Sequence, residues 1–266
     1  MRYSLKRIGK HAKQIGEFDE IILYTPTLLP SYMKESPLMT YKCGGGYWAW
    51  KPAIIWETLQ KQDDGDIVVY TDAGCSLKKN AQWEAYWDML STNYNTIVFQ
   101  FKDEMPEWKQ WGQTSTKIRH WTKRSAFRYF EEILGDYGDY NKIMGGIIIC
   151  KGKKNSFIRH WLDITLSHPE LIIDPSAEEK KDQIPSFAYH KHDQSVITPL
   201  AHLYAQEVLI LPETAETEPE NAAVIASRIR TKTLLDYMKL RLKFYTRKFL
   251  GDKLFDSIKH NLMKKK

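Results

Sequence analysis

Long apolar runs and paired cysteines are what this sequence of 266 residues lacks most clearly. No stretch reaches the roughly 20 apolar residues needed to span a lipid bilayer, and the first residues contain no apolar signal segment. The three cysteines, Cys43, Cys75 and Cys150, are too few and too far apart for a disulfide framework or a thiolate zinc site. We therefore expect a cytoplasmic protein whose membrane contact, if any, is peripheral on the inner face of the cell membrane.

A net positive charge is also confined to one segment. Residues 228–266 hold thirteen lysines and arginines against three aspartates, while the rest of the chain is slightly acidic. This distribution argues against a general affinity for nucleic acid and predicts a local affinity for an anionic surface. In the helical pattern that precedes Leu250, one stripe is apolar and comprises Leu234, Met238, Leu242, Tyr245 and Phe249.

Three interpretations of this tail remain open. A basic helix with an apolar stripe is typical of segments that lie on an anionic membrane surface. The same stripe can instead pack on the rest of the protein, with the lysines solvated. A nucleic-acid-binding tail is the third and least favoured interpretation.

Aromatic residues, in contrast, are abundant, with nine tryptophans and fifteen tyrosines. They indicate either a thick core or a site where flat rings stack on a carbohydrate or a nucleobase.

The apolar pattern predicts an α/β fold with a mainly parallel sheet flanked by helices, because continuous apolar runs alternate with helical patterns. The predicted strands are Glu20–Tyr24, Asp66–Thr71, Thr96–Phe101, Gly146–Cys150 and Glu207–Leu211. The predicted helices are Trp50–Lys61, Asn80–Leu90, Trp121–Leu134, Asn155–Leu166 and Asp193–Tyr204. A surface loop is predicted at Pro169–Pro185, and the domain boundaries at a catalytic domain 1–211, an acidic linker 212–226 and a basic helical tail 227–266.

The first candidate site follows the predicted strand that ends at Thr71. Asp72 and Gly74 stand where a parallel strand meets the ligand-binding edge of an open sheet. A carboxylate there can hold a ribose hydroxyl or a metal that bridges a diphosphate. Asp72 as a simple helix N-cap is the alternative.

The second candidate is the segment Gly44–Pro52, GGGYWAWKP. Its glycines allow close approach to a phosphate or a sugar, and its aromatic residues offer stacking surfaces. Lys51 beside a helix N-terminus makes an anion-binding site plausible. The alternative is a glycine turn followed by an aromatic helix cap.

The third candidate is His190–Ser195, HKHDQS, directly before an apolar helical pattern. Packing a core requires none of these polar side chains, which can bind a metal, orient a diphosphate or face a reacting sugar. The alternative is Asp193 as an N-cap with solvated histidines.

Together these segments resemble bacterial glycosyltransferases of surface polysaccharide (capsule and lipopolysaccharide) synthesis, of the GT-A type. The resemblance rests on segments that follow one another in the same order: Gly46–Pro52, Asp72–Gly74, Trp121–Lys123, Gly145–Gly146 and His190–Ser195. It covers roughly residues 4–211. Lys191 stands where an arginine is expected, and Asp72–Gly74 has a single carboxylate where the familiar signature has two. The chain also opens on a helical pattern, Ser4–Gly16, so we expect the usual first strand to be missing.

The resemblance implies a hexosyltransferase that uses a UDP-sugar donor and a saccharide or lipid-linked acceptor, with retention of configuration. It implies that Asp193 and Gln194 are catalytic, and that Mn²⁺ or Mg²⁺, if used, is held by Asp72 and His192. The implied donor-binding residues are Tyr47, Trp48, Trp50, Lys51, Asp72, Gly74, Lys123, Gly145, Gly146, His190 and His192. A sugar-nucleotide- or carbohydrate-binding protein without transfer activity is the alternative function.

Overall fold

The computed structural model describes residues 2–250, with side chains up to Leu242. The chain forms two compact units. Of the described residues, the first combines residues 2–23, 73–77 and 226–250, and the second combines residues 24–72 and 78–225. The predicted domain boundaries follow the chain continuously, whereas each of these units is assembled from separate segments.

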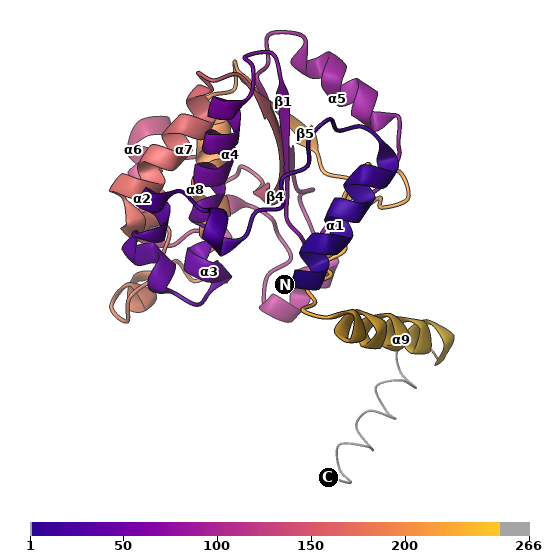
Figure 1. Ribbon diagram of the computed structural model, residues 1–266. Helices are drawn as coiled ribbons and strands as arrows, with labels where there is room; N and C mark the ends of the chain where they lie inside the picture. Colours follow the sequence, from indigo (N-terminus) through magenta and orange to yellow (C-terminus); the bar gives the residue numbers. More distant parts are fainter. Residues whose placement is uncertain (1, 251–266) are drawn as a thin grey trace. The chain divides into compact units, whose positions relative to one another are not determined.

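The second unit is an α/β structure built on a four-stranded mixed sheet (Figure 1). Its strands are β1 (Ile67–Thr71), β3 (Thr96–Gln100), β4 (Ile143–Lys151) and β5 (Val208–Pro212), in the order β1-β4-β3-β5. Its helices are α2 (Ser31–Lys34), α3 (Gly44–Tyr47), α4 (Trp50–Lys61), α5 (Gln82–Leu90), α6 (Arg124–Leu134), α7 (Ser156–Ser167) and α8 (Asp193–Leu203). Four of the five predicted strands and all five predicted helices are confirmed to within a few residues.

The prediction of a mainly parallel sheet is wrong. Strand β4 pairs antiparallel with both β1 and β3, and only β3 and β5 pair in parallel. The strands β1, β3 and β5 therefore share one direction, and β4 runs against them from its central position. A strand buried on both faces reads as a continuous apolar run whichever way it runs, so the sequence pattern gave no information about direction.

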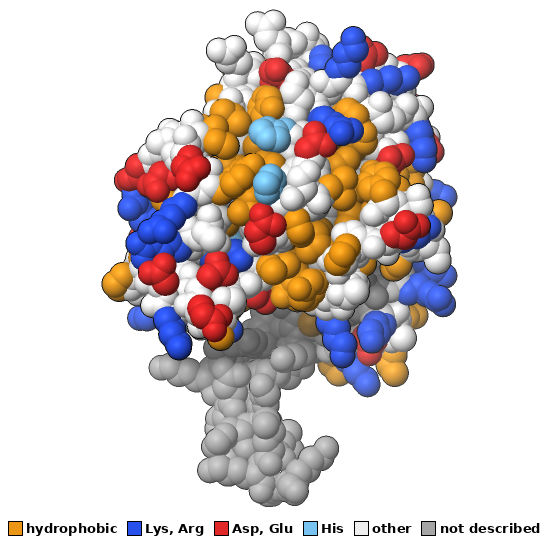
Figure 2. Space-filling model, turned by 90° about the vertical axis from the view of Figure 1, so that its left-hand side faces the viewer, with side chains coloured by type: hydrophobic (Ala, Val, Ile, Leu, Met, Phe, Trp, Pro, Cys, Tyr) orange, Lys and Arg blue, Asp and Glu red, His pale blue; other side chains and the backbone are white. Residues whose placement is uncertain are grey.

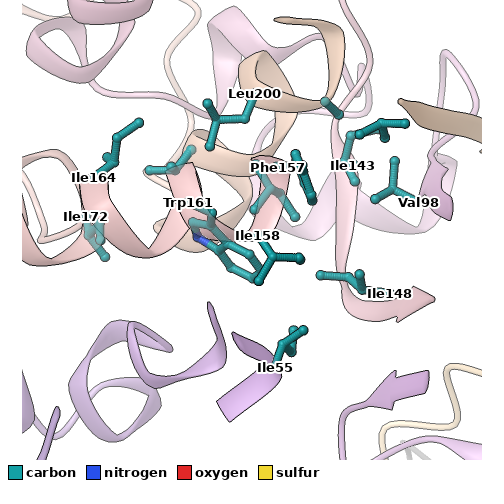
Figure 3. Close-up of a cluster of buried hydrophobic side chains, with 14 of the residues drawn as sticks. Ile55, Val98, Ile143, Ile148, Phe157, Ile158, Trp161, Ile164, Ile172 and Leu200 are labelled. Carbon is teal, nitrogen blue, oxygen red and sulfur yellow. The ribbon is translucent and has the colours of Figure 1, made fainter. Parts of the chain in front are cut away.

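The core of the second unit lies between the sheet and the helices α4, α6, α7 and α8. Figure 3 shows Ile158 and Trp161 of α7 above Ile55 of α4, with the strand residues Val98 and Ile148 to their right. Helix α7 begins where its sequence predicts, because the Asn155 side chain accepts a hydrogen bond from the Ile158 N–H at 2.9 Å. On the face in Figure 2, hydrophobic side chains lie between groups of both charge signs.

The first unit contains α1 (Arg2–Ile15) and α9 (Leu234–Leu250). Polar contacts hold α1 in this unit: the Ser4 hydroxyl donates to Ile229 O at 2.7 Å, and the Arg7 guanidinium donates to Cys75 O at 2.5 Å. The two-residue strands β2 (Ser76–Leu77) and β6 (Val224–Ile225) belong to the first and the second unit, respectively. Within the described residues, every helix is too short or too polar to cross a membrane.

The predicted strand Glu20–Tyr24 is wrong, because these residues form neither a strand nor a helix. Ile22 and Leu23 are exposed. Leu23 lies so close to α1 that a Cβ added to Gly9 would come within 2.9 Å of its side chain. The apolar run therefore contacts a helix, and apolar content without a partner strand is not enough to form a ladder.

The predicted tail helix is present as α9, which begins at Leu234. Thr233 and Asp236 exchange reciprocal hydrogen bonds of 3.1 Å at its start, the arrangement of a capping box. Of the predicted apolar stripe, Leu234, Met238 and Leu242 are exposed. The side chains of Tyr245 and Phe249, and residues 251–266, lie outside the described part of the chain.

Candidate active site

The ammonium group of Lys51 joins three of the predicted segments at one point. Its Nζ lies 2.6 Å from Asp193 Oδ2, 2.6 Å from the carbonyl oxygen of Gly145 and 3.5 Å from Asp72 Oδ1. The Lys51 side chain is 3% exposed. Because an unpaired charge at such a depth is very costly, these oxygens are what allow a lysine to be buried here.

The positions of these groups follow from the ends of three elements. Lys51 lies in the first turn of α4, and Asp193 is the first residue of α8. Asp72 directly follows β1, and its N–H donates to Gly146 O at 2.9 Å, which continues the β1–β4 ladder by one residue. Two helix N-termini and a strand end therefore meet at one place, where the positive ends of the helix dipoles favour negative charge.

Burial and charge act against each other in this ion pair. Burial alone would lower the pKa of Lys51, but the charges of Asp193 and Asp72 outweigh it and raise the pKa above its usual value. Burial raises the pKa of Asp193, and the Lys51 ammonium opposes that rise. The ionised form of Asp193 therefore depends on Lys51.

The two carboxylates differ in access. The Asp193 side chain is 8% exposed, whereas that of Asp72 is 25% exposed. Tyr70 donates a hydrogen bond of 2.7 Å to Asp72 Oδ1, which fixes the orientation of this carboxylate. Asp72 is thus the carboxylate that can accept hydrogen bonds from a ligand.

Gly145 is required by the ion pair itself. A Cβ added there would lie 2.6 Å from Asp193 Oδ2, closer than real Cβ atoms come. At Gly146 the nearest atom would be Asp72 Oδ2, at 3.3 Å. The glycine pair of β4 therefore lets both carboxylates approach the strand.

The segment Gly44–Trp48 is a left-handed turn. The φ angles of its glycines are 57°, 62° and 97°, and Tyr47 and Trp48 continue the turn at 54° and 60°. A left-handed conformation costs an L-residue roughly 1–2 kcal/mol, and strain of this kind concentrates at functional sites. A Cβ on Gly46 would come within 3.0 Å of Leu38 O, so this glycine serves packing.

Aromatic contacts connect the Gly44–Trp48 turn to the histidine segment His190–Ser195. The ring of Tyr47 lies 4.6 Å from that of His192, and the ring of Trp48 lies 5.6 Å from it. Trp48 is also 6.0 Å from Lys51 Nζ. The Trp50 side chain contacts the turn itself, where its Nε1 donates to Gly44 O at 3.0 Å.

His190 is fully buried and bonded through both ring nitrogens. Its Nε2 lies 3.1 Å from Leu171 O, which can only accept, so this nitrogen carries the proton. Its Nδ1 then accepts from the Lys123 N–H at 3.2 Å. Burial lowers the pKa of His190 well below its usual value, and the neutral ring joins two loops.

Two other predicted residues also have partners within the fold. The Lys123 side chain is buried, and its Nζ lies 3.3 Å from Glu179 Oε2. Gly74 belongs to the first unit, where its carbonyl oxygen accepts from the Ile229 N–H at 3.0 Å. The contacts of Lys123 and Gly74 are thus contacts within the protein, and the donor-binding roles of both residues stay predictions.

The structure adds Lys142, which the sequence pattern gave no reason to select. Its Nζ lies 4.0 Å from the ring centre of Trp108 and 4.5 Å from that of Trp121, and it donates to Gln194 Oε1 at 3.3 Å. The last bond holds the amide oxygen of Gln194 towards Lys142. The NH₂ group of Gln194 is then the end that can meet a substrate.

Other groups near the site were also missed. Tyr70 lies two residues before Asp72, and Tyr189 directly precedes His190. This proximity in the sequence is the signal that could have found them. Asp174 accepts a hydrogen bond of 2.9 Å from the Tyr47 hydroxyl. It lies within the predicted loop Pro169–Pro185, where no local pattern distinguishes it from its neighbours.

The predicted metal ligands do not form a metal site by themselves. Across the described residues, no three histidine, cysteine, aspartate or glutamate side chains are grouped so as to hold a metal ion. His192 Nδ1 lies 2.8 Å from Ile172 O, and its Nε2 lies 3.1 Å from the Tyr189 hydroxyl. Because ligation would break one of these bonds, His192 fits a metal poorly, and Asp72 is the residue with an accessible carboxylate.

Comparison with known proteins adds little. No protein-family model matches the chain, and no curated protein matches it either. The solved structure of mouse xyloside xylosyltransferase 1 in its apo form is similar at 12% identity and a TM-score of 0.39, over 72% of this chain and 62% of that chain. This chain thus spans less than two thirds of that protein chain. A likeness this weak says nothing about the chemistry of the present protein.

Proposed function

We propose that this chain is a glycosyltransferase, which moves a sugar from a nucleotide-sugar donor to a saccharide acceptor. One observation carries the proposal: three segments that are far apart in the chain, and that resemble glycosyltransferase motifs, meet at the Lys51 ammonium. A chance resemblance of separate short segments would not require them to meet. Surface polysaccharide synthesis, a UDP-sugar donor and a retaining reaction are the finer parts of this proposal, and they rest on the resemblance.

The reaction breaks the bond between the anomeric carbon and the diphosphate, whose oxygen keeps the electron pair. The acceptor hydroxyl oxygen forms the new bond and loses its proton. Positive charge grows on the sugar and negative charge on the leaving group, so the protein must stabilise both. Lys51 and the N-termini of α4 and α8 favour negative charge, which suits the diphosphate.

The role of Asp72 follows from its access, and the other roles rest on the resemblance. Asp72 is the accessible carboxylate and is assigned to the ribose hydroxyls of the donor. Asp193, whose ionised form Lys51 favours, and the amide of Gln194 are assigned to the reacting sugar. Tyr47, Trp48 and Trp50 shape the donor side, together with Gly145 and Gly146. The use of Mn²⁺ or Mg²⁺ stays a prediction. In it, Asp72 contacts a metal ion that is bound to the donor diphosphate. Donor turnover measured with and without manganese tests this prediction.

One observation favours a second function, a sugar-nucleotide-binding protein without transfer activity. Asp193 is largely buried and bonded to Lys51, which is also what a purely structural ion pair would show. Slow hydrolysis of a sugar nucleotide separates the two functions, because transferases usually release some donor sugar to water. Binding that stabilises the protein without any hydrolysis would favour the second function.

Asp72→Asn is expected to abolish transfer, with a loss of turnover of at least about a hundredfold, and to leave the thermal unfolding temperature unchanged. The carboxylate is partly exposed and accepts from Tyr70, a bond that the asparagine oxygen can keep. A radiolabelled or coupled sugar-transfer assay measures the loss. Asp163→Asn is the matched control, since Asp163 is an exposed aspartate paired with Arg159 on α7. Near-normal turnover of Asp72→Asn would remove Asp72 from the donor site.

We further propose that the tail binds an anionic membrane surface. Leu234, Leu235, Met238, Leu240 and Leu242 of α9 are exposed, and residues 228–266 carry the excess of positive charge. Apolar burial combined with about 1 kcal/mol per basic residue makes such a helix bind anionic lipid. This position would bring the site to a lipid-linked acceptor.

The triple substitution of Leu234, Met238 and Leu242 by glutamine is expected to abolish co-sedimentation with phosphatidylglycerol vesicles at low salt. The unchanged protein should bind these vesicles but not phosphatidylcholine vesicles. Substitution is preferable to deletion of residues 228–266, because Thr231 and Ile229 hydrogen-bond to Ser4 of α1. Leu166→Gln, at an exposed leucine of α7, is the control. An unchanged protein that ignores anionic vesicles would instead favour a tail that packs on protein.

A further inference from the structure

A group of aromatic side chains lies next to one carboxylate beside the candidate active site. We call Tyr41, Tyr47, Asp174, Tyr189 and His192 the tyrosine–aspartate cluster. The rings of Tyr41 and Tyr47 are 4.9 Å apart, those of Tyr47 and His192 4.6 Å, and those of Tyr189 and His192 5.6 Å. The rings thus form a continuous chain in the second unit.

The hydrogen bonds of the cluster have defined directions. His192 Nδ1 donates to Ile172 O, because a carbonyl can only accept. Burial lowers the pKa of His192, so the ring is neutral and its Nε2 accepts from the Tyr189 hydroxyl at 3.1 Å. Tyr47 donates to Asp174 Oδ2. The hydroxyls of Tyr47 and Tyr189 therefore donate within the cluster, while the Asp174 carboxylate remains an acceptor.

Asp174 has capacity for further hydrogen bonds. A carboxylate offers about four acceptor positions, and Tyr47 occupies one of them. The Asp174 side chain is 43% exposed, and its Oδ1 is 3.7 Å from His192 Nε2, too far for a hydrogen bond to this ring. Hydroxyl groups of a ligand can reach the carboxylate from the solvent side.

Two rings of the cluster are also open to solvent. Tyr41 is 41% exposed and Tyr189 is 42% exposed. An exposed aromatic face attracts the apolar C–H face of a pyranose ring, and a carboxylate accepts from its hydroxyl groups. A phosphate would be repelled by Asp174, so the charge of the cluster selects a neutral saccharide over the donor's diphosphate.

The backbone holds the cluster at an energetic cost. Tyr47 and His192 both have positive φ angles, 54° and 48°, in a region that residues with a side chain rarely adopt. Relaxing either angle would move a ring that contacts the other. Strain that keeps two rings together beside an exposed carboxylate is typical of a binding site.

The cluster is one aromatic ring away from the Lys51 ion pair. Trp48 contacts His192 with its ring at 5.6 Å and lies 6.0 Å from Lys51 Nζ. A saccharide bound on Tyr189 and Asp174 would therefore lie close to the reacting centre. We propose that the tyrosine–aspartate cluster binds a neutral pyranose ring of the acceptor. The acceptor role rests on the proposed function, whereas saccharide binding by the cluster does not.

Saturation-transfer NMR with methyl glycosides tests this proposal without any turnover. The probes are the methyl pyranosides of glucose, galactose, mannose, xylose and N-acetylglucosamine. At least one is expected to receive magnetisation from the unchanged protein. Tyr189→Ala and Asp174→Asn are each expected to weaken its binding about tenfold, the usual effect of losing one hydrogen bond to a charged group or one ring contact.

Tyr32→Ala is the matched control. Tyr32 is similarly exposed, and its hydroxyl donates to Glu57 at 3.1 Å, but it lies outside the cluster. The control is expected to bind the glycoside like the unchanged protein, and circular dichroism should show that all three variants are folded.

Two results overturn the proposal: none of the glycosides binds, or binding is the same in Tyr189→Ala and Asp174→Asn as in the control. The proposed function fails separately. Glycoside binding that depends on Tyr189 and Asp174, in a protein that hydrolyses and transfers no sugar nucleotide, would retain the cluster as a saccharide site and reject the transferase. Transfer with an unchanged acceptor KM in both variants would reject only the acceptor role of the cluster.

Discussion

Lys51→Met is expected to lower the free energy of unfolding by about 3–5 kcal/mol, the cost of removing one partner from a buried ion pair. Methionine fills the volume of the lysine stem but leaves Asp193 without a cation at 2.6 Å. The pKa of Asp193 should then rise further, because burial already raises it and Lys51 opposes the rise. Urea unfolding followed by tryptophan fluorescence at neutral pH measures the change.

Two variants show whether charge is the cause. Lys102→Met removes an exposed partner, since Lys102 and Glu218 form a surface pair, and should cost less than about 1 kcal/mol. The double variant Lys51→Met with Asp193→Leu removes both charges and should recover much of the lost stability. Equal losses in Lys51→Met and Lys102→Met would show that the buried pair contributes no more than a surface pair.

Asp193→Asn and Gln194→Ala are each expected to lower kcat by about 10²–10³-fold while changing the KM for the donor by less than about threefold. Removing an interaction that forms only in the transition state lowers turnover, whereas removing uniform binding raises KM. Gln194 is oriented by Lys142, so Lys142→Met should reproduce part of the Gln194→Ala effect. Steady-state transfer kinetics measure both constants.

The kinetics need a stability control, because Asp193→Asn leaves the Lys51 ammonium with a weaker partner. Assays belong well below the unfolding temperature of each variant. Gln60→Ala is the matched amide control, since the Gln60 side chain is exposed and donates to Lys153 O. A raised donor KM at unchanged kcat would move Asp193 and Gln194 from the reacting centre to the periphery of the donor.

Local features of the fold could be predicted from the sequence. Helix α4 spans the predicted residues Trp50–Lys61, and α7 (Ser156–Ser167) lies within one residue of the predicted helix Asn155–Leu166. These elements depend on side chains within a few residues of one another, through propensity, capping and periodicity. The direction of β4 could not be predicted in this way, because its apolar residues Ile147, Ile148 and Ile149 are buried in either orientation.

For the candidate site too, some residues could be predicted from local sequence and others could not. Asp72, Lys51 and Asp193 each stood out beside a turn or a helix start, where packing alone does not require a polar side chain. Nothing local could predict that one ammonium contacts both carboxylates, because residues 51 and 193 meet only after α4, α8 and the sheet have packed. Lys142 and Asp174 carry no local signal at all.

The sequence by itself determined the α/β class, the limits of most helices and strands, and the segments where chemistry is concentrated, because these depend on short-range side-chain patterns. The tertiary structure decided the mixed order of the sheet, the loss of the strand expected at Glu20–Tyr24 and the separation of Gly74 into the first unit. It also decided which predicted residues are buried supports, such as His190, and which are accessible, such as Asp72. The physical reason is that burial and strand pairing depend on partners distant in the chain, whereas a sequence pattern reports only its immediate neighbourhood.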